Sequence, residues 1–169
     1  GRVLMAGLVD CHTHACWAGP SVAGQAAGLD GRIDEWDMKR KGVPYLKILE
    51  RGGGIMASVR AVRGASQDEL TEQLLSRLAV MLAHGTTTVE VKSGYGLTTA
   101  DELKMLRAIA AARPHFPGTI VATALLGHAI DPDQPGVVGI TVRQTLAAVA
   151  SEFPGVCVDA FCEKGAWDL

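Results

Sequence analysis

The sequence lacks several features that define common classes of protein. No apolar run approaches the roughly 18 residues of a membrane-spanning helix, and nothing in the first residues resembles a signal peptide. Lysine and arginine form no basic stripe, and the net charge is close to neutral at −2. These absences argue against nucleic acid or a membrane as a partner, and we expect a cytoplasmic protein.

Cysteines are few, and none belongs to a Cys-x-x-Cys pair. Cys11, Cys157 and Cys162 lie within apolar, strand-like runs, whereas Cys16 follows a pair of histidines. We therefore expect buried, reduced thiols. Cys11 alternates with the histidines, so its side chain should face away from theirs, which makes it a poor third metal ligand.

Short apolar segments recur along the chain and predict strands at residues 7–14, 86–93, 119–129 and 156–163. Amphipathic helices are predicted between them, with start signals near Ser66, Thr99 and Thr141. The first connection, 15–62, is unusually long and rich in glycine and charge, with local helix expected around 44–51.

Strands that are apolar on both faces and alternate with amphipathic helices predict a parallel α/β fold. A doubly wound sheet is the main alternative to a barrel. All four predicted strands finish with reactive side chains, at the ends where a barrel places its chemistry; they are His12 and His14, the run from Lys92 to Tyr95, His128 and Glu163. We predict roughly the first four units of a TIM-like (β/α)8 barrel.

The predicted domain is a partial barrel over 1–169 with an inserted loop at about 18–31. A whole barrel of this kind normally needs around 250 residues. Because the sequence starts and stops abruptly, we expect an interior piece of a longer polypeptide.

His12 and His14 are the strongest sign of chemistry in the chain. In a strand, residues two apart point to the same side, so this spacing puts both imidazoles together at one strand end. Neutral imidazole is a leading ligand for zinc and iron, and two from one strand make half of a mononuclear site. A pair of ordinary surface or core histidines is the alternative.

Several motifs resemble a known family. Residues 10–14, Asp-Cys-His-Thr-His, resemble the amidohydrolase superfamily, and the run 87–97, which contains Lys-Ser-Gly-Tyr-Gly, is similar to the imidazolonepropionase family. Residues 52–55 and 161–165 carry the same resemblance. It implies a hydrolase that opens the ring amide of 4-imidazolone-5-propanoate to N-formimino-L-glutamate in histidine degradation. It also implies one Zn or Fe ion per subunit, a small β domain beside the barrel and a homodimer.

The resemblance further implies roles for individual residues. They are His12 and His14 as metal ligands, Arg32 and Tyr95 as substrate-binding residues, and His128 as a substrate-binding and catalytic residue. The forked guanidinium of Arg32 suits a propanoate tail. The remaining metal ligands of the family would lie beyond Leu169, so we expect this chain alone to be inactive.

Other interpretations stay open at this point. Another cyclic amidohydrolase or deaminase of the superfamily is one alternative, and a non-catalytic half-barrel that binds a ligand or partner is the other. Two ligands are fewer than the three that a catalytic zinc usually takes, and open sheet edges favour association. Arg32 could be a solvated loop residue, Tyr95 could pack against the barrel rim, and His128 could be a core histidine.

Charged residues near the strand ends have structural interpretations as well. Glu90 and Lys92 alternate on one face of a predicted strand and are expected to fill the polar interior of the barrel. Glu163 lies at the tip of the fourth predicted strand. It could orient substrate or a metal-bound water, but we expect a structural role, as a rim ion pair with Lys92 or Lys164.

Overall fold

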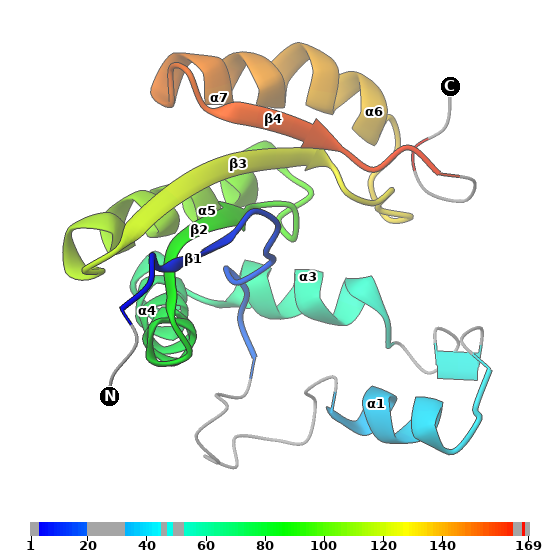
Figure 1. Ribbon diagram of the computed structural model, residues 1–169. Helices are drawn as coiled ribbons and strands as arrows, with labels where there is room; N and C mark the ends of the chain where they lie inside the picture. Colours follow the sequence, from blue (N-terminus) through cyan, green and yellow to red (C-terminus); the bar gives the residue numbers. More distant parts are fainter. Residues whose placement is uncertain (1–3, 20–32, 45–46, 49–52, 164–166, 168–169) are drawn as a thin grey trace.

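The computed structural model describes residues 4–19, 33–44, 47–48, 53–163 and 167. Its strands form one sheet in the order β1-β2-β3-β4, and each neighbouring pair is parallel. The strands are β1 Leu8–Asp10, β2 Thr86–Lys92, β3 Thr119–Gly127 and β4 Cys157–Ala160. The sheet curls as half of a barrel does (Figure 1). The predicted α/β fold, a partial barrel, is confirmed.

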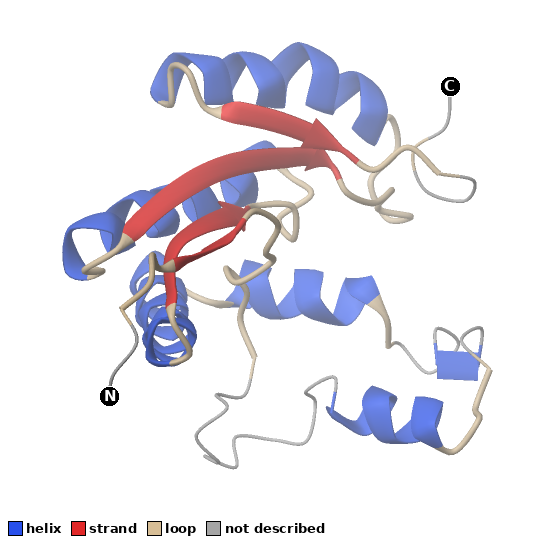
Figure 2. Cartoon of the chain, in the orientation of Figure 1, coloured by secondary structure: helices blue, strands red, loops and turns tan. Residues whose placement is uncertain are grey.

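Helices connect successive strands. Between β1 and β2 lie α1 (Ile33–Arg40), α3 (Ile55–Gly64) and α4 (Gln67–Ala83). The later connections are α5 (Thr99–Ala112) with the 3-10 turn Arg113–His115, and then α6 (Val137–Ile140), a π-helical turn (Thr141–Thr145) and α7 (Leu146–Glu152). Figure 2 shows α4, α5 and α7 around the outside of the curled strands.

The main core lies between the sheet and these outer helices. As the sequence predicts, α4 begins with a capping box: the Ser66 hydroxyl accepts the Glu69 N–H at 3.1 Å, and the Glu69 carboxylate accepts the Ser66 N–H at 2.8 Å. The apolar face of α4 packs with the outward face of β2, through Leu70, Leu74, Leu78, Val89 and Val91. The alternate residues of β2 therefore face the inside of the curl.

Several element boundaries differ from those predicted. The last helical segment begins at Val137, immediately after the left-handed Gly136, and Thr141 lies inside it at the π-helical turn. α5 is capped by Thr98 rather than Thr99. The sequence pattern predicts neither α1 nor α3, which both fall in the long first connection. Of the local helix expected at 44–51, residues 47–48 are helical and 45–46 and 49–51 lie outside the described residues.

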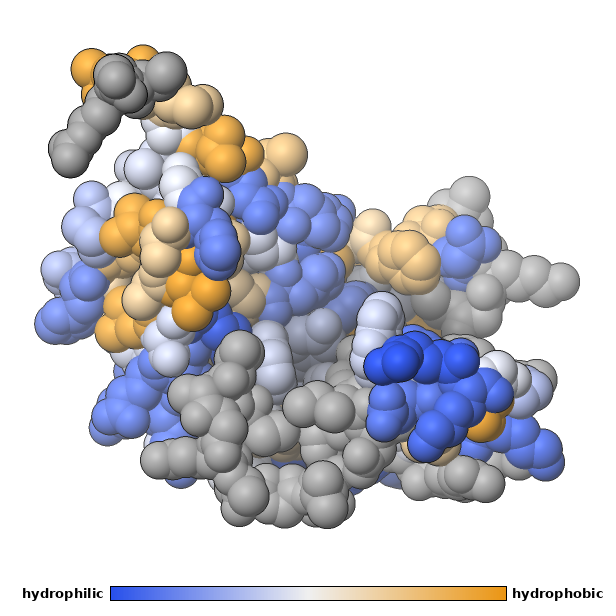
Figure 3. Space-filling view, turned by 60° about the horizontal axis from the view of Figure 1, so that its bottom comes forward, coloured by the Kyte–Doolittle hydropathy of each residue, from blue (hydrophilic) through white to orange (hydrophobic). Residues whose placement is uncertain are grey.

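Apolar side chains are exposed on both outer strands. Leu8 and Val9 of β1 are half or more exposed, and so is Val158 of β4. On the face shown in Figure 3, apolar residues gather in clusters that border hydrophilic ones. Each outer strand pairs on one side only within the described residues. An adjoining strand would bury both the apolar side chains and the free edges.

The open edges of the sheet explain why the predicted burial of the cysteines is wrong for three of the four. Cys11, Cys157 and Cys162 are exposed because they lie in or beside the outer strands, and Cys16 alone is buried as expected. Burial raises the pKa of the Cys16 thiol to about 12, so this thiol is protonated and unreactive.

No helix within the described part of the chain is long and apolar enough to cross a membrane.

Candidate active site

The two histidines lie beyond the end of β1. The strand was predicted to run to residue 14 but ends at Asp10. Thr13 nevertheless stays against β2, because its N–H donates to the Glu90 carboxylate at 3.0 Å and its carbonyl accepts the Lys92 N–H at 3.1 Å. His12 and His14, on either side of Thr13, lie close together as predicted, with their ring centroids 5.4 Å apart.

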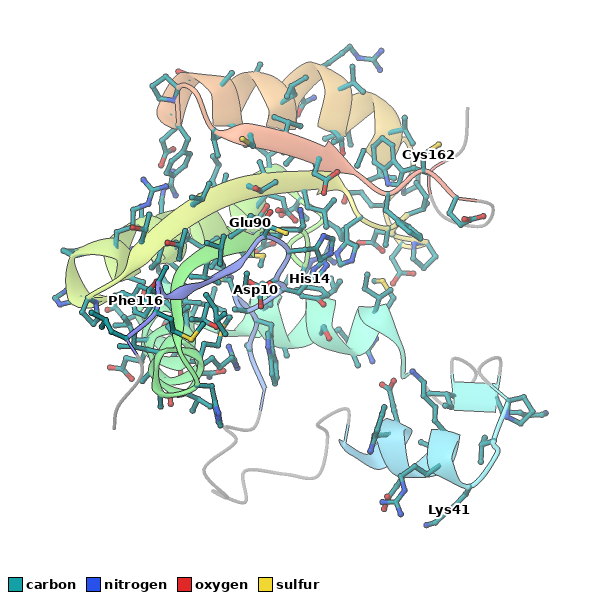
Figure 4. All side chains as sticks on the ribbon, in the orientation of Figure 1. Asp10, His14, Lys41, Glu90, Phe116 and Cys162 are labelled. Carbon is teal, nitrogen blue, oxygen red and sulfur yellow. The ribbon has the colours of Figure 1, made fainter. Side chains whose placement is uncertain are left out.

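Tyr95 and His128 meet His14 from the neighbouring strands. Tyr95 follows β2, His128 follows β3, and their ring centroids are 5.0 Å apart. The His14 ring stacks on His128 at 4.9 Å and lies 5.8 Å from Tyr95. Figure 4 shows His14 beyond the end of the sheet, on the side where α3 lies. Three consecutive strands thus deliver four predicted site residues to one place.

Burial and charge make His14 a neutral imidazole near pH 7. Burial, followed by the neighbouring His128 and His12, lowers the pKa of His14 to about 4. Its Nδ1 atom is buried and has no hydrogen-bond partner among the described residues. A neutral ring is the form that binds a metal ion.

Glu102 of α5 organises the loop that carries Tyr95, and sequence reasoning missed this role. Its fully buried carboxylate accepts the N–H groups of Gly94, Gly96 and Leu97 at 2.8, 2.8 and 2.9 Å. Burial raises the pKa of Glu102, although these hydrogen bonds oppose the shift. The sequence does show an acidic residue, Glu102, shortly after the Gly-x-Gly turn. Because acidic residues are common in the first turn of a helix, this signal did not reveal that Glu102 binds the loop.

The same loop sets the tautomer of His128. The carbonyl of Gly94 lies 2.8 Å from His128 Nδ1 and accepts the proton carried there. The neutral ring then carries its proton on Nδ1 and not on Nε2. Gly94 has a φ of 113°, and a Cβ atom there would lie 3.0 Å from His128 Nδ1. Glycine is therefore required both by the backbone conformation and by the close approach of the imidazole.

An ion-pair network lies beside the histidines on the inner face of the sheet. Lys92 Nζ contacts the carboxylates of Glu90 at 2.7 Å and Asp159 at 2.8 Å. Although burial acts in the opposite direction, hydrogen bonds to Asp159 and Glu90 raise the pKa of Lys92. The polar interior expected for Glu90 and Lys92 is confirmed. Lys92 pairs with Asp159, which sequence reasoning did not single out, while Glu163 is exposed and its N–H donates to the carbonyl of Trp167.

The site fits a metal ion only in part. His12 and His14 offer two imidazoles, and the buried Nδ1 of His14 has no hydrogen-bond partner in the part of the chain that the structure describes. Among the described residues, no group of three or more His, Cys, Asp or Glu side chains is arranged to hold a metal. A complete catalytic site needs a further ligand from elsewhere. Arg32, predicted to bind substrate, lies outside the described residues.

Arg63 of α3 joins the two loops that carry Tyr95 and His128. Its guanidinium donates to the Gly96 carbonyl at 2.9 Å and to the buried Asp131 carboxylate at 2.7 Å. Burial alone would raise the pKa of Asp131, but hydrogen bonds from Arg63 and from the Asp133 N–H lower it. The helix is thereby fixed across the carboxyl ends of β2 and β3.

This pair predicts a specific loss of stability in acid. Because the pKa of Asp131 is lower in the folded chain than in the unfolded one, its contribution is complete above the unfolded value of about 3.9 and is lost as the pH falls below it. Asp131→Asn should therefore flatten the decline of the unfolding free energy between about pH 5 and pH 2, measured by urea denaturation. Asp133→Asn, which alters an exposed neighbour, should keep the wild-type slope. Equal slopes for both variants would contradict the role of Asp131.

A curled parallel β/α sheet with imidazole and phenol groups gathered at the carboxyl ends of its strands has the architecture of a barrel enzyme. Comparison with curated proteins is more specific. The chain is 42% identical over 173 residues to an imidazolonepropionase of Vibrio parahaemolyticus, covering 100% of this chain and 39% of that protein. It is 44% identical over 167 residues to one of Ectopseudomonas mendocina, covering 96% of this chain and 38% of that protein.

A third relative, the imidazolonepropionase of Symbiobacterium thermophilum, is 43% identical over 175 residues, covering 100% of this chain and 38% of that protein. No family model matches the chain. The resemblance to imidazolonepropionase predicted from the motifs is confirmed over the whole chain, which spans about two fifths of the length of these relatives.

Proposed function

We propose that this chain forms the first half of the barrel of an imidazolonepropionase, a hydrolase that opens the ring amide of 4-imidazolone-5-propanoate to N-formimino-L-glutamate. The observation that carries the proposal is the convergence of His12, His14, Tyr95 and His128 beyond three neighbouring strands. It occurs in a chain that matches imidazolonepropionases over its whole length. The homodimer and the cytoplasmic location stay predictions.

His12 and His14 would hold one zinc or iron ion, which supplies an activated water and polarises the ring carbonyl when bound. The neutral state of His14 supports this role, because protonation would block a ligand nitrogen.

His128 and Tyr95 would bind the substrate ring beside this ion. With its Nδ1 proton donated to Gly94, His128 would meet the ring carbonyl through Nε2. When Nε2 is also protonated, it donates a charge-assisted hydrogen bond to the oxygen that gains negative charge in the transition state. The buried position of Tyr95 against both histidine rings supports a role for its phenol in orienting the same substrate ring.

Arg32 provides the sharpest test of the proposed substrate. Its guanidinium would bind the propanoate carboxylate, so Arg32→Ala should raise KM for 4-imidazolone-5-propanoate far more than for an analogue that lacks the carboxylate. The measurement is steady-state hydrolysis by the polypeptide that contains this chain. Arg40→Ala is the matched control, because Arg40 is an exposed arginine at the end of α1. An equal rise in KM for the two substrates would contradict the proposal.

A second candidate, a half-barrel that binds a ligand or partner without turnover, is favoured by the two unpaired sheet edges and by the two-histidine site. For the 169-residue chain in isolation we expect weak metal binding, no turnover and self-association. Sedimentation measures whether the isolated chain self-associates, and a hydrolysis assay measures whether it turns over substrate. A monomer with measurable hydrolysis would contradict the half-barrel that binds without turnover.

A further inference from the structure

The short segment between the two histidines is held to β2 at three points. The N–H of Thr13 donates to one carboxylate oxygen of Glu90, its hydroxyl donates to the Glu90 carbonyl, and its own carbonyl accepts the N–H of Lys92. Thr13 is covalently joined to both His12 and His14. Fixing its backbone therefore fixes the direction in which both imidazoles leave the chain.

The side chain of Glu90 is itself fixed by charge. One oxygen, Oε2, accepts the Thr13 N–H, while the other, Oε1, lies 2.7 Å from Lys92 Nζ. Lys92 is held in turn by Asp159 at 2.8 Å, and its side chain is only 6% exposed. The network extends from β4, past β3, to β2 and ends at the histidine segment. A partly buried carboxylate that is held at both oxygens has little freedom to change rotamer.

We propose that Glu90 is a positioning residue that sets the separation of the His12 and His14 rings, with Lys92 and Asp159 holding its carboxylate in place. The inference rests on the proposed metal centre, because the benefit of a fixed ring separation is a higher affinity for a shared ion. Groups that orient ligands in this way typically change metal affinity by about 10- to 100-fold.

The strand itself provides a matched control for this role. Glu90 and Lys92 face inward, whereas Val91 between them faces the helices and is fully buried. Val91→Ala weakens the packing of β2 without touching Thr13. Glu90→Ala removes both contacts of the carboxylate, and Glu90→Gln retains an oxygen for the Thr13 N–H while losing the charge that Lys92 binds.

The test is a zinc titration of the polypeptide that contains this chain, followed by calorimetry, together with hydrogen exchange of the Thr13 amide. We expect Glu90→Ala to weaken zinc binding at least 10-fold and to accelerate exchange at Thr13, and Glu90→Gln to give a smaller loss. Val91→Ala should bind zinc within about twofold of wild type. Asp159→Asn should weaken binding less than Glu90→Ala, because it acts through Lys92.

The possible outcomes separate this inference from the proposed function. Zinc binding that disappears in His14→Ala but stays within twofold of wild type in Glu90→Ala would leave the metal centre intact and overturn the positioning role. An equal loss in Glu90→Ala and Val91→Ala would also overturn it, since the effect would then follow stability. Zinc binding that is unchanged by His14→Ala would contradict the metal centre itself and the inference with it.

Discussion

Glu102→Gln is expected to lower the free energy of unfolding by about 3 kcal/mol. The two carboxylate oxygens accept three backbone N–H groups from the loop after β2. A glutamine amide offers one oxygen, and its NH2 group would face at least one of these N–H donors inside the protein. Each buried donor that loses its acceptor costs about 1–3 kcal/mol, a large share of the 5–15 kcal/mol that stabilises a typical domain.

Urea denaturation followed by circular dichroism measures this loss. Glu72→Gln is the matched control, because Glu72 is an exposed glutamate on α4. We expect the control to stay within about 0.5 kcal/mol of wild type, as surface substitutions usually do. Similar small changes in both variants would show that the buried carboxylate does not hold the Tyr95 loop.

His128→Ala is expected to lower the kcat for 4-imidazolone-5-propanoate about 100-fold in the polypeptide that contains this chain, if the proposed function holds; such a loss is typical for one donor to a developing oxyanion. The imidazole is fixed by Gly94 and lies against His14 and Tyr95, so its removal empties the place where the ring carbonyl would bind. Its effect on KM should be smaller, because the interaction strengthens as negative charge develops.

His115→Ala is the control for removing a histidine that lies outside the site, because His115 is exposed in the 3-10 turn after α5. This variant should keep the wild-type kcat and KM. If His128→Ala raises KM and leaves kcat unchanged, His128 binds the substrate but does not act on the transition state.

The sequence predicted the elements whose signals are local. Alternating apolar runs and helix caps located all four strands and α4, and the strand ends brought His14, Tyr95 and His128 together. Strand length was harder to predict, because within the described residues β1 pairs only with β2, and its register shifts after Leu8. The last helix also began earlier than predicted, since Thr141 resembles a cap in sequence but is followed and preceded by helical residues.

The supporting residues could not be recognised from the sequence, because their roles depend on burial and on distant partners. Glu102 resembles any acidic residue near a helix start, and only the folded loop makes it an acceptor for three N–H groups. Asp159 pairs with Lys92 across the inner face of the sheet, although the two residues are 67 positions apart in the sequence. Exposed cysteines were mispredicted because their apolar neighbours suggested burial, whereas the outer strands are open.

Product analysis tests the central claim most directly. The polypeptide that contains this chain, loaded with zinc or iron, would be incubated with 4-imidazolone-5-propanoate, and N-formimino-L-glutamate would be measured by mass spectrometry. We predict that the product forms with the wild type and is lost in His12→Ala and His14→Ala, while His115→Ala retains it. Absence of the product from a folded, metal-loaded wild type, or its persistence in both ligand variants, would contradict the account.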